Sequence, residues 1–70
     1  MRHKVKHRRY REIKNALDQA GLRFRIVEMT NAHHVRITLD NGRKVFTGAT
    51  PSDHRTLKKM VADARKEARV

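Results

Sequence analysis

Residues 34–47 read HVRITLDNGRKVFT, and this stretch decides the fold. Apolar residues stand at every second position of its first half, which predicts a strand over 34–39 that is buried on one face. The dipeptide Asn41-Gly42 follows, and this pair tolerates the positive φ angles of a type I′ hairpin turn. A further strand is therefore expected over 44–47.

A two-residue turn would also fix how the two strands pair. Ile37 would face Phe46 and His34 would face Ala49, so that Phe46 joins the core side of the sheet. The outer side would then carry mostly basic and polar residues, namely His34, Arg36, Thr38, Val45 and Thr47 together with Arg23 and Arg25.

A helix and a strand are expected before the hairpin. From residue 8 onward, apolar residues recur at spacings of three and four and form one stripe, which consists of Tyr10, Ile13, Leu17 and Ala20. Gly21 ends the helix, because glycine adopts the left-handed C-cap conformation without steric cost. The period then changes to two over 22–27, with Leu22, Phe24 and Ile26 on the core side and Arg23 and Arg25 on the outer side.

A second helix is expected after the hairpin. Thr50 is the expected N-cap, Pro51 the first helical residue, and Asp53 lies where it favours the positive end of the helix. The apolar stripe of this helix is Leu57, Val61, Ala64 and Ala68.

These elements predict an α+β fold of order α-β-β-β-α, with two helices packed on one face of a three-stranded antiparallel sheet. Residues 8–70 are expected to form a single domain, and residues 1–7 a flexible basic arm. A chain of 70 residues buries only about 60% of its unfolded surface. Its stability should therefore be modest, and a homodimer is an alternative to a monomer.

The charge points to a polyanionic partner. Eighteen lysines and arginines stand against seven aspartates and glutamates, which gives a net charge of +11. A net charge of about 2 to 8 already keeps a small domain soluble, so the excess indicates nucleic acid. The three aromatic residues fit the core pattern, so contacts should run mainly to phosphate and sugar. This favours shape-based binding of a duplex or structured RNA over sequence-specific reading of a groove, and RNA is expected rather than DNA.

The expected nucleic-acid-binding residues come from the arm, both helices and the outer side of the sheet. They are Arg2, Lys4, Lys6, Arg8, Arg9, Arg11, Arg23, Arg25, Arg36, Lys58, Lys59 and Arg65.

Compartment and cofactors follow from what the sequence lacks. There is no cysteine, no apolar run long enough for a membrane span and no signal-peptide pattern, so we expect a cytoplasmic protein associated with RNA or the nucleoid and no membrane partner. The five histidines do not form a zinc-binding pattern, so we expect no metal and no other cofactor.

Two short stretches resemble motifs of the HicA family of mRNA interferase toxins. Residues 31–34 read Asn-Ala-His-His where that family shows Gly-Ser-His-x, and residues 55–60 read Arg-Thr-Leu-Lys-Lys-Met where it shows Gly-Thr-Leu-x-x-Ile. The resemblance implies a fold close to a double-stranded-RNA-binding domain, a metal-independent endoribonuclease activity and an acidic antitoxin as partner. Both glycines of the family motifs are absent here.

The resemblance also implies a catalytic histidine, and two positions compete for it. Counting forward from Ala32 selects His33, whereas counting back from the Asn-Gly turn selects His34. Strand alternation puts His34 on the outer basic face and His33 at the edge of the core, which favours His34. That imidazole would move a proton as the ribose 2′-hydroxyl attacks phosphorus, and Arg36 or Arg25 would stabilise the phosphorane charge.

Two functions are therefore compatible with the sequence. The first is a small nucleic-acid-binding protein without catalytic activity, of the kind encoded by phages and mobile elements. The alternative is a HicA-like ribonuclease toxin. The missing motif glycines favour the binding protein.

Overall fold

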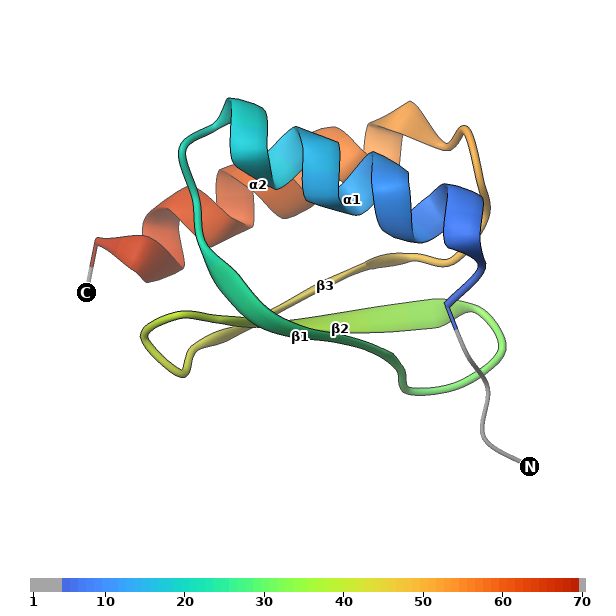
Figure 1. The fold of residues 1–70 in the computed structure, drawn as a ribbon, viewed down its shortest axis with the longest axis horizontal. Helices are drawn as coiled ribbons and strands as arrows, with labels where there is room; N and C mark the ends of the chain where they lie inside the picture. The colour runs from blue at the N-terminus through green and yellow to red at the C-terminus, as the bar shows by residue number, and fades with distance from the viewer. Residues whose placement is uncertain (1–4, 70) are drawn as a thin grey trace.

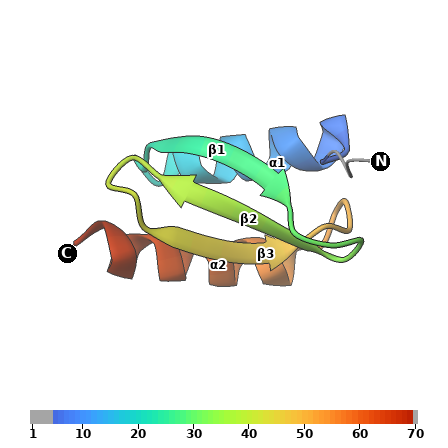
Figure 2. The same ribbon diagram turned by 90° about the horizontal axis from the view of Figure 1, so that it is seen from below.

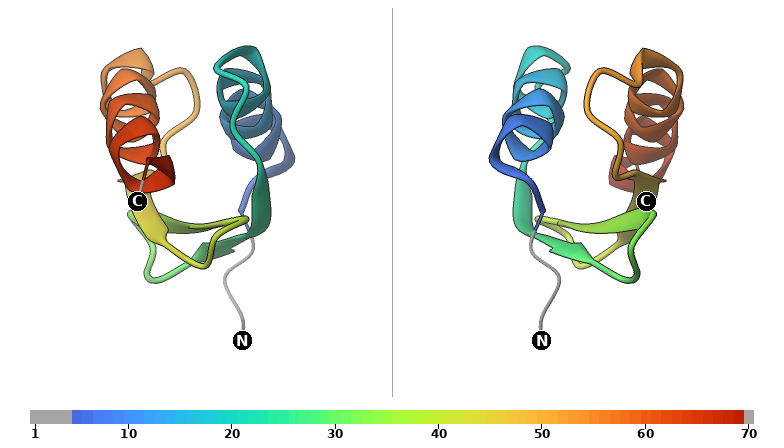
Figure 3. Two further views of the ribbon diagram at one scale, coloured as in Figure 1. Left: turned by 90° about the vertical axis from the view of Figure 1, so that its left-hand side faces the viewer. Right: turned by 90° about the vertical axis from the view of Figure 1, so that its right-hand side faces the viewer.

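The computed structural model describes residues 5–69 and has the expected order of one helix, three strands and one helix (Figure 1). The elements are α1 (His7–Gln19), β1 (Phe24–Met29), β2 (His34–Leu39), β3 (Lys44–Gly48) and α2 (His54–Ala68). The strands form one antiparallel sheet in the order β1-β2-β3. Both helices lie on the same face of that sheet (Figure 3), so the α+β architecture is confirmed.

The core lies between the helices and the covered face of the sheet. Burial of alternate residues along β2 and of every third or fourth residue along the helices brings the apolar side chains together. The buried apolar residues are Ile13, Leu17, Val35, Ile37, Leu39, Val45, Leu57, Met60 and Ala64. Within residues 5–69, neither helix combines the length and the apolar character that a membrane span requires.

The hairpin between β2 and β3 has three loop residues rather than the expected two. Leu39 N–H donates to the Arg43 carbonyl oxygen at 2.7 Å, which leaves residues 40–42 in the loop. Gly42 has a φ of +87°, the left-handed conformation that follows a turn in three-residue hairpins. The side-chain oxygen of Asn41 accepts a hydrogen bond from Arg43 N–H at 2.9 Å and supports this longer loop.

The longer loop moves the register by one residue and reverses the two faces of β3. Ile37 pairs with Val45, and Arg36 pairs with Phe46. Val45 and Thr47 therefore point into the core, whereas the Phe46 side chain lies on the open face and is 55% exposed. The sequence-based placement of Phe46 in the core was wrong, because a one-residue shift in pairing turns every side chain of a strand to the other face.

A bulge in β1 causes a second reversal. Phe24 pairs with Leu39 and Ile26 pairs with Thr38, so Arg25 is an extra residue on β1. Beyond the bulge Val27 packs against the core, whereas Ile26 is 52% exposed and was wrongly expected on the core side. Figure 2 shows the open face of the sheet, which the helices leave uncovered.

Helix α1 begins one residue earlier than expected and buries a different stripe. Ile13 and Leu17 are buried as expected, but Tyr10 is 37% exposed and meets Phe24 edge to ring at a centroid distance of 6.5 Å. The buried residue in the first turns is Arg9, which is 0% exposed.

Helix α2 begins three residues later than expected. Asp53 is its N-cap and accepts a hydrogen bond from Thr56 N–H at 3.4 Å, so Thr50 is not the cap. Residues 50–53 instead form a turn in which Asp53 N–H donates to the Thr50 carbonyl. Along α2, Met60 is buried and Ala68 is exposed, which corrects the expected stripe.

Candidate nucleic-acid interface

One end of the molecule collects the amino ends of both helices and the two loops 30–33 and 49–53 (Figure 1, Figure 2). The loops are joined by a bond from Ala49 N–H to the His33 carbonyl at 3.0 Å. Arg8 Nη2 donates to Ser52 Oγ at 2.6 Å and joins α1 to the second loop. We call this end of the molecule the basic end.

Arg9 organises the basic end from inside. Its Nε donates to the Gly48 carbonyl oxygen at 2.9 Å, and its Nη2 donates to Thr56 Oγ1 at 2.8 Å. Nη1 contacts a carboxylate oxygen of Glu12 at 3.1 Å, and the Asp53 carbonyl lies 3.4 Å from both Nη atoms. One buried guanidinium therefore connects α1, the end of β3 and the start of α2.

This burial removes Arg9 from the expected nucleic-acid-binding residues. A side chain that is 0% exposed and whose nitrogens bond within the protein cannot reach a phosphate. The sequence-based placement of Arg9 on the solvent side of the first helix was wrong. Buried charge is tolerated here because all three guanidinium nitrogens form hydrogen bonds within the protein.

Glu12 extends the same network to loop 49–53. Both of its carboxylate oxygens lie 3.0 Å from Ser52 N, and Ser52 has a positive φ of 67°. The hydrogen bond from the Ser52 backbone lowers the pKa of Glu12, and Arg9 adds to this effect, while burial opposes it. Glu12 therefore holds Ser52 in a backbone conformation that residues other than glycine rarely adopt.

The solvent side of the basic end carries cations without acidic partners. Six lysines and arginines here are exposed, and in residues 5–69 none of them forms an ion pair with a carboxylate. They are Lys6, Arg8, Arg11, Arg55, Lys58 and Lys59. Four histidines are exposed beside them, namely His7, His33, His34 and His54.

Elsewhere, several cations are neutralised by carboxylates. Arg25 lies 3.7 Å from Asp40, Arg43 lies 3.4 Å from Glu67, and Lys14 lies 2.9 Å from Asp18. Arg36 contacts Glu28 on the open face of the sheet at 2.6 Å. The carboxylates of these four pairs are therefore not bound to the exposed cations of the basic end, and Glu12 at that end pairs with the buried Arg9.

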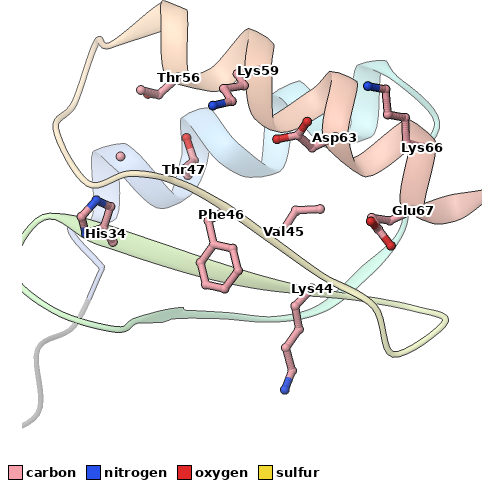
Figure 4. Close-up of a pocket in the computed structure, with 11 residues that line it drawn as sticks. His34, Lys44, Val45, Phe46, Thr47, Thr56, Lys59, Asp63, Lys66 and Glu67 are labelled. Carbon is pink, nitrogen blue, oxygen red and sulfur yellow. The ribbon is translucent and has the colours of Figure 1, made fainter.

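The cations of α2 are divided between its two sides. Lys58 and Arg65 line a groove of about 900 Å³ between α1 and α2, together with His54. Lys59 and Lys66 line a second groove on the other side, between α2 and β3 (Figure 4). The α2 cations that were expected to bind therefore do not all lie on one side of the helix.

The candidate catalytic residue His34 begins β2 at the basic end. Asn31 Oδ1 accepts hydrogen bonds from the backbone N–H groups of His33 and His34, which identifies it as the amide oxygen. The Nδ1 atom of His34 lies 3.1 Å from the same oxygen. An amide oxygen only accepts, so this contact is a hydrogen bond in the tautomer that carries its proton on Nδ1, and in that tautomer Nε2 is the acceptor. His33 is exposed rather than packed at the core edge.

The arginines expected to assist His34 are not assembled around it. Arg36 shares the open face with His34, but its Nε and Nη2 both donate to one Glu28 oxygen, at 2.9 and 2.6 Å. Arg25 lies in the half of β1 that pairs with the end of β2, whereas His34 begins β2. Arg23 precedes β1 at that same distant end.

Some expected residues lie outside the described part of the chain, and one member of the basic end was missed. Arg2 and Lys4 of the expected arm fall outside residues 5–69, and His7 already belongs to α1. Arg55 was not among the expected binding residues. It stands three residues before Lys58, and this spacing is the signal that could have found it, because residues three apart are neighbours on a helix surface.

The described residues hold no group of three or more histidine or acidic side chains arranged to bind a metal ion. Comparisons with models of protein families, with curated proteins and with solved structures found no match to this chain.

Proposed function

We propose that this protein binds nucleic acid through the basic end, with duplex or structured RNA preferred over DNA. The observation that carries the proposal is the set of exposed, unpaired cations at the amino ends of α1 and α2. Such cations gain affinity by releasing the counterions condensed on a polyphosphate.

Two further features support phosphate as the ligand. Both helices point their amino ends, which carry a partial positive charge, toward the same end of the molecule (Figure 1). The Arg9 network fixes these helix ends relative to each other. A rigid array of cations suits the fixed backbone geometry of a duplex, and the resemblance to the HicA family favours RNA.

Salt-dependent binding to a 16-base-pair RNA duplex, followed by fluorescence anisotropy, tests the proposal. A plot of log affinity against log salt has a negative slope. In the basic-end variant Arg11→Gln/Arg55→Gln/Lys58→Gln this slope should become shallower by about 0.9 for each phosphate that the variant no longer neutralises.

The matched control Arg23→Gln/Arg25→Gln/Arg43→Gln removes the same charge from the opposite end and should change the slope little. An equal change of slope in the two variants would refute a localised interface. Binding of a DNA duplex of the same sequence as tightly as RNA would refute the RNA preference.

A second candidate function is the HicA-like endoribonuclease, which rests on the contact between Asn31 and His34. A ring whose orientation is fixed through Nδ1 and whose Nε2 can accept a proton is the form that a general base requires. In this case His34→Ala would abolish cleavage of labelled RNA but keep its retention, and an acidic antitoxin would be the expected partner. RNA that wild-type protein retains without cutting would eliminate this candidate.

A further inference from the structure

We propose that the free edge of β3 and the groove beside it bind an extended acidic peptide segment of a partner protein, which pairs with β3 as a fourth strand. This site runs along the edge of the sheet and shares Lys59 with the basic end, and its ligand goes beyond the proposed binding of nucleic acid. It is supported by the backbone of β3, one buried hydroxyl and the charge of the groove.

The backbone of β3 offers unused pairing groups. β3 is an edge strand of the sheet. At one end of its pairing with β2, Leu39 N–H donates to the Arg43 carbonyl, and at the other end Ala49 N–H donates to the His33 carbonyl. Antiparallel ladders alternate, so Val45 and Thr47 bond toward β2. The N–H and C=O groups of Lys44 and Phe46 therefore point away from the sheet, where a further strand would pair.

A groove of about 400 Å³ follows this edge beneath α2 (Figure 4). Val45, Phe46 and Thr47 form its β3 side, and Lys59 and Lys66 stand on its α2 side. Side chains of a strand alternate between two faces. One set on a bound strand would therefore enter the groove under α2, and the other set would lie beside the exposed Phe46 ring.

Thr47 supplies an independent sign of a ligand. Its side chain is 5% exposed, and its Oγ1 is buried without a hydrogen-bond partner within the described structure. Figure 4 shows this side chain between β3 and α2, in the wall of the groove. A buried hydroxyl without a partner is costly, and a polar side chain of the bound strand would provide one.

Charge selects an acidic strand. Lys44, Lys59 and Lys66 outnumber the two acidic residues of the groove, Asp63 and Glu67, and Glu67 already pairs with Arg43. A second copy of this chain would bring its own basic β3 edge against the first, and like charges facing each other across a strand pair are unfavourable. An acidic strand of a different protein would instead be attracted.

The test uses NMR with isotope-labelled protein and a seven-residue capped peptide of alternating glutamate and valine, without RNA. We expect the largest shifts at the amides of Lys44 and Phe46. A peptide of the same charge, N-methylated at three consecutive central residues, should not bind, because it lacks N–H donors on both edges.

Two variants identify the groove. Thr47→Val should weaken binding of the peptide about five- to tenfold, as expected for one missing hydrogen bond, whereas Thr38→Val on the open face should leave affinity unchanged. Equal binding of the N-methylated peptide, or shifts confined to the basic end, would overturn the proposal. So would shifts at β3 caused by duplex RNA but not by the peptide. Failure of the peptide to bind to the wild-type protein would refute this site but would not bear on the proposed binding of nucleic acid.

Discussion

The Nε atom of Arg9 donates a hydrogen bond to the carbonyl oxygen of Gly48 at 2.9 Å, and this contact joins the first turns of α1 to the last residue of β3. Gly48 is also where the chain leaves the sheet for α2. The position of both helix amino ends therefore depends on one buried cation, and stability and the proposed interface are coupled through it.

Replacing Arg9 with alanine should destabilise the protein by about 3 to 5 kcal/mol, because the substitution leaves buried acceptors without their donor. Arg9→Lys should recover little, since an ammonium cannot reproduce the planar set of donors that reaches Gly48 and Thr56. Urea unfolding measures both effects. Arg8→Ala, an exposed change in the same turn, should stay within about 0.5 kcal/mol of wild type. A comparable loss in this control would assign the effect to the helix rather than to the buried network.

The shifted hairpin makes opposite predictions for two neighbouring residues. Phe46→Ala should change the free energy of unfolding by less than about 1 kcal/mol, because the ring is largely exposed on the open face. Val45→Ala should cost about 2 kcal/mol, since it removes two buried methyl groups and leaves a cavity. Thermal unfolding of the two variants distinguishes the registers. A greater loss of stability in Phe46→Ala than in Val45→Ala would instead support the two-residue turn.

The sequence predicted the elements of this fold better than their pairing. Alternation in β2 and the helical stripe through Ile13 and Leu17 are repeated signals, so their burial was predicted correctly. Turn length is decided by a few backbone angles around Gly42, and Asn-Gly is compatible with loops of two or three residues. The same local ambiguity hid the bulge at Arg25.

The candidate site was predicted in part for a similar reason. Exposed cations such as Arg11 and Lys58 follow from charge and helical period, but which cations are neutralised depends on contacts between distant segments. Arg9 reaches residues more than 35 positions away, and no spacing rule along the chain reports such a contact. Arg9, Ile13 and Leu17 are spaced four residues apart, so Arg9 continues the buried stripe of α1. Its charge argued against placing it in the core.

Acid should weaken the fold through Glu12. Its pKa in the folded protein is lowered from an ordinary value near 4.5, chiefly by the Ser52 backbone hydrogen bond and further by Arg9. A lowered pKa stabilises the protein above the unfolded pKa, and this contribution is lost as the pH falls through the folded pKa. Unfolding followed by circular dichroism from pH 7 to pH 2 should show a steeper acid decline in wild type than in Glu12→Gln.

The control for this pH dependence is Glu28→Gln, which removes a partly exposed ion pair on the open face. That variant should keep the acid decline of wild type, because the Glu12 contact is intact. An unchanged pH profile in Glu12→Gln would mean that the Ser52 contact does not form in solution.

Thr47→Val should raise the stability of the isolated protein, although it shortens no loop and fills no cavity. The Oγ1 atom is buried without a partner in the described structure, so folding removes the hydroxyl from water without replacing its hydrogen bonds. A methyl group of similar size at this position removes that penalty, and we expect a gain of about 1 kcal/mol by urea unfolding. Thr38→Val is the matched control and should give a smaller change, since Thr38 is only half-buried on the open face. A loss of stability in Thr47→Val would show that the hydroxyl already has a hydrogen-bond partner in the free protein. The hydroxyl would then no longer support a ligand in the groove.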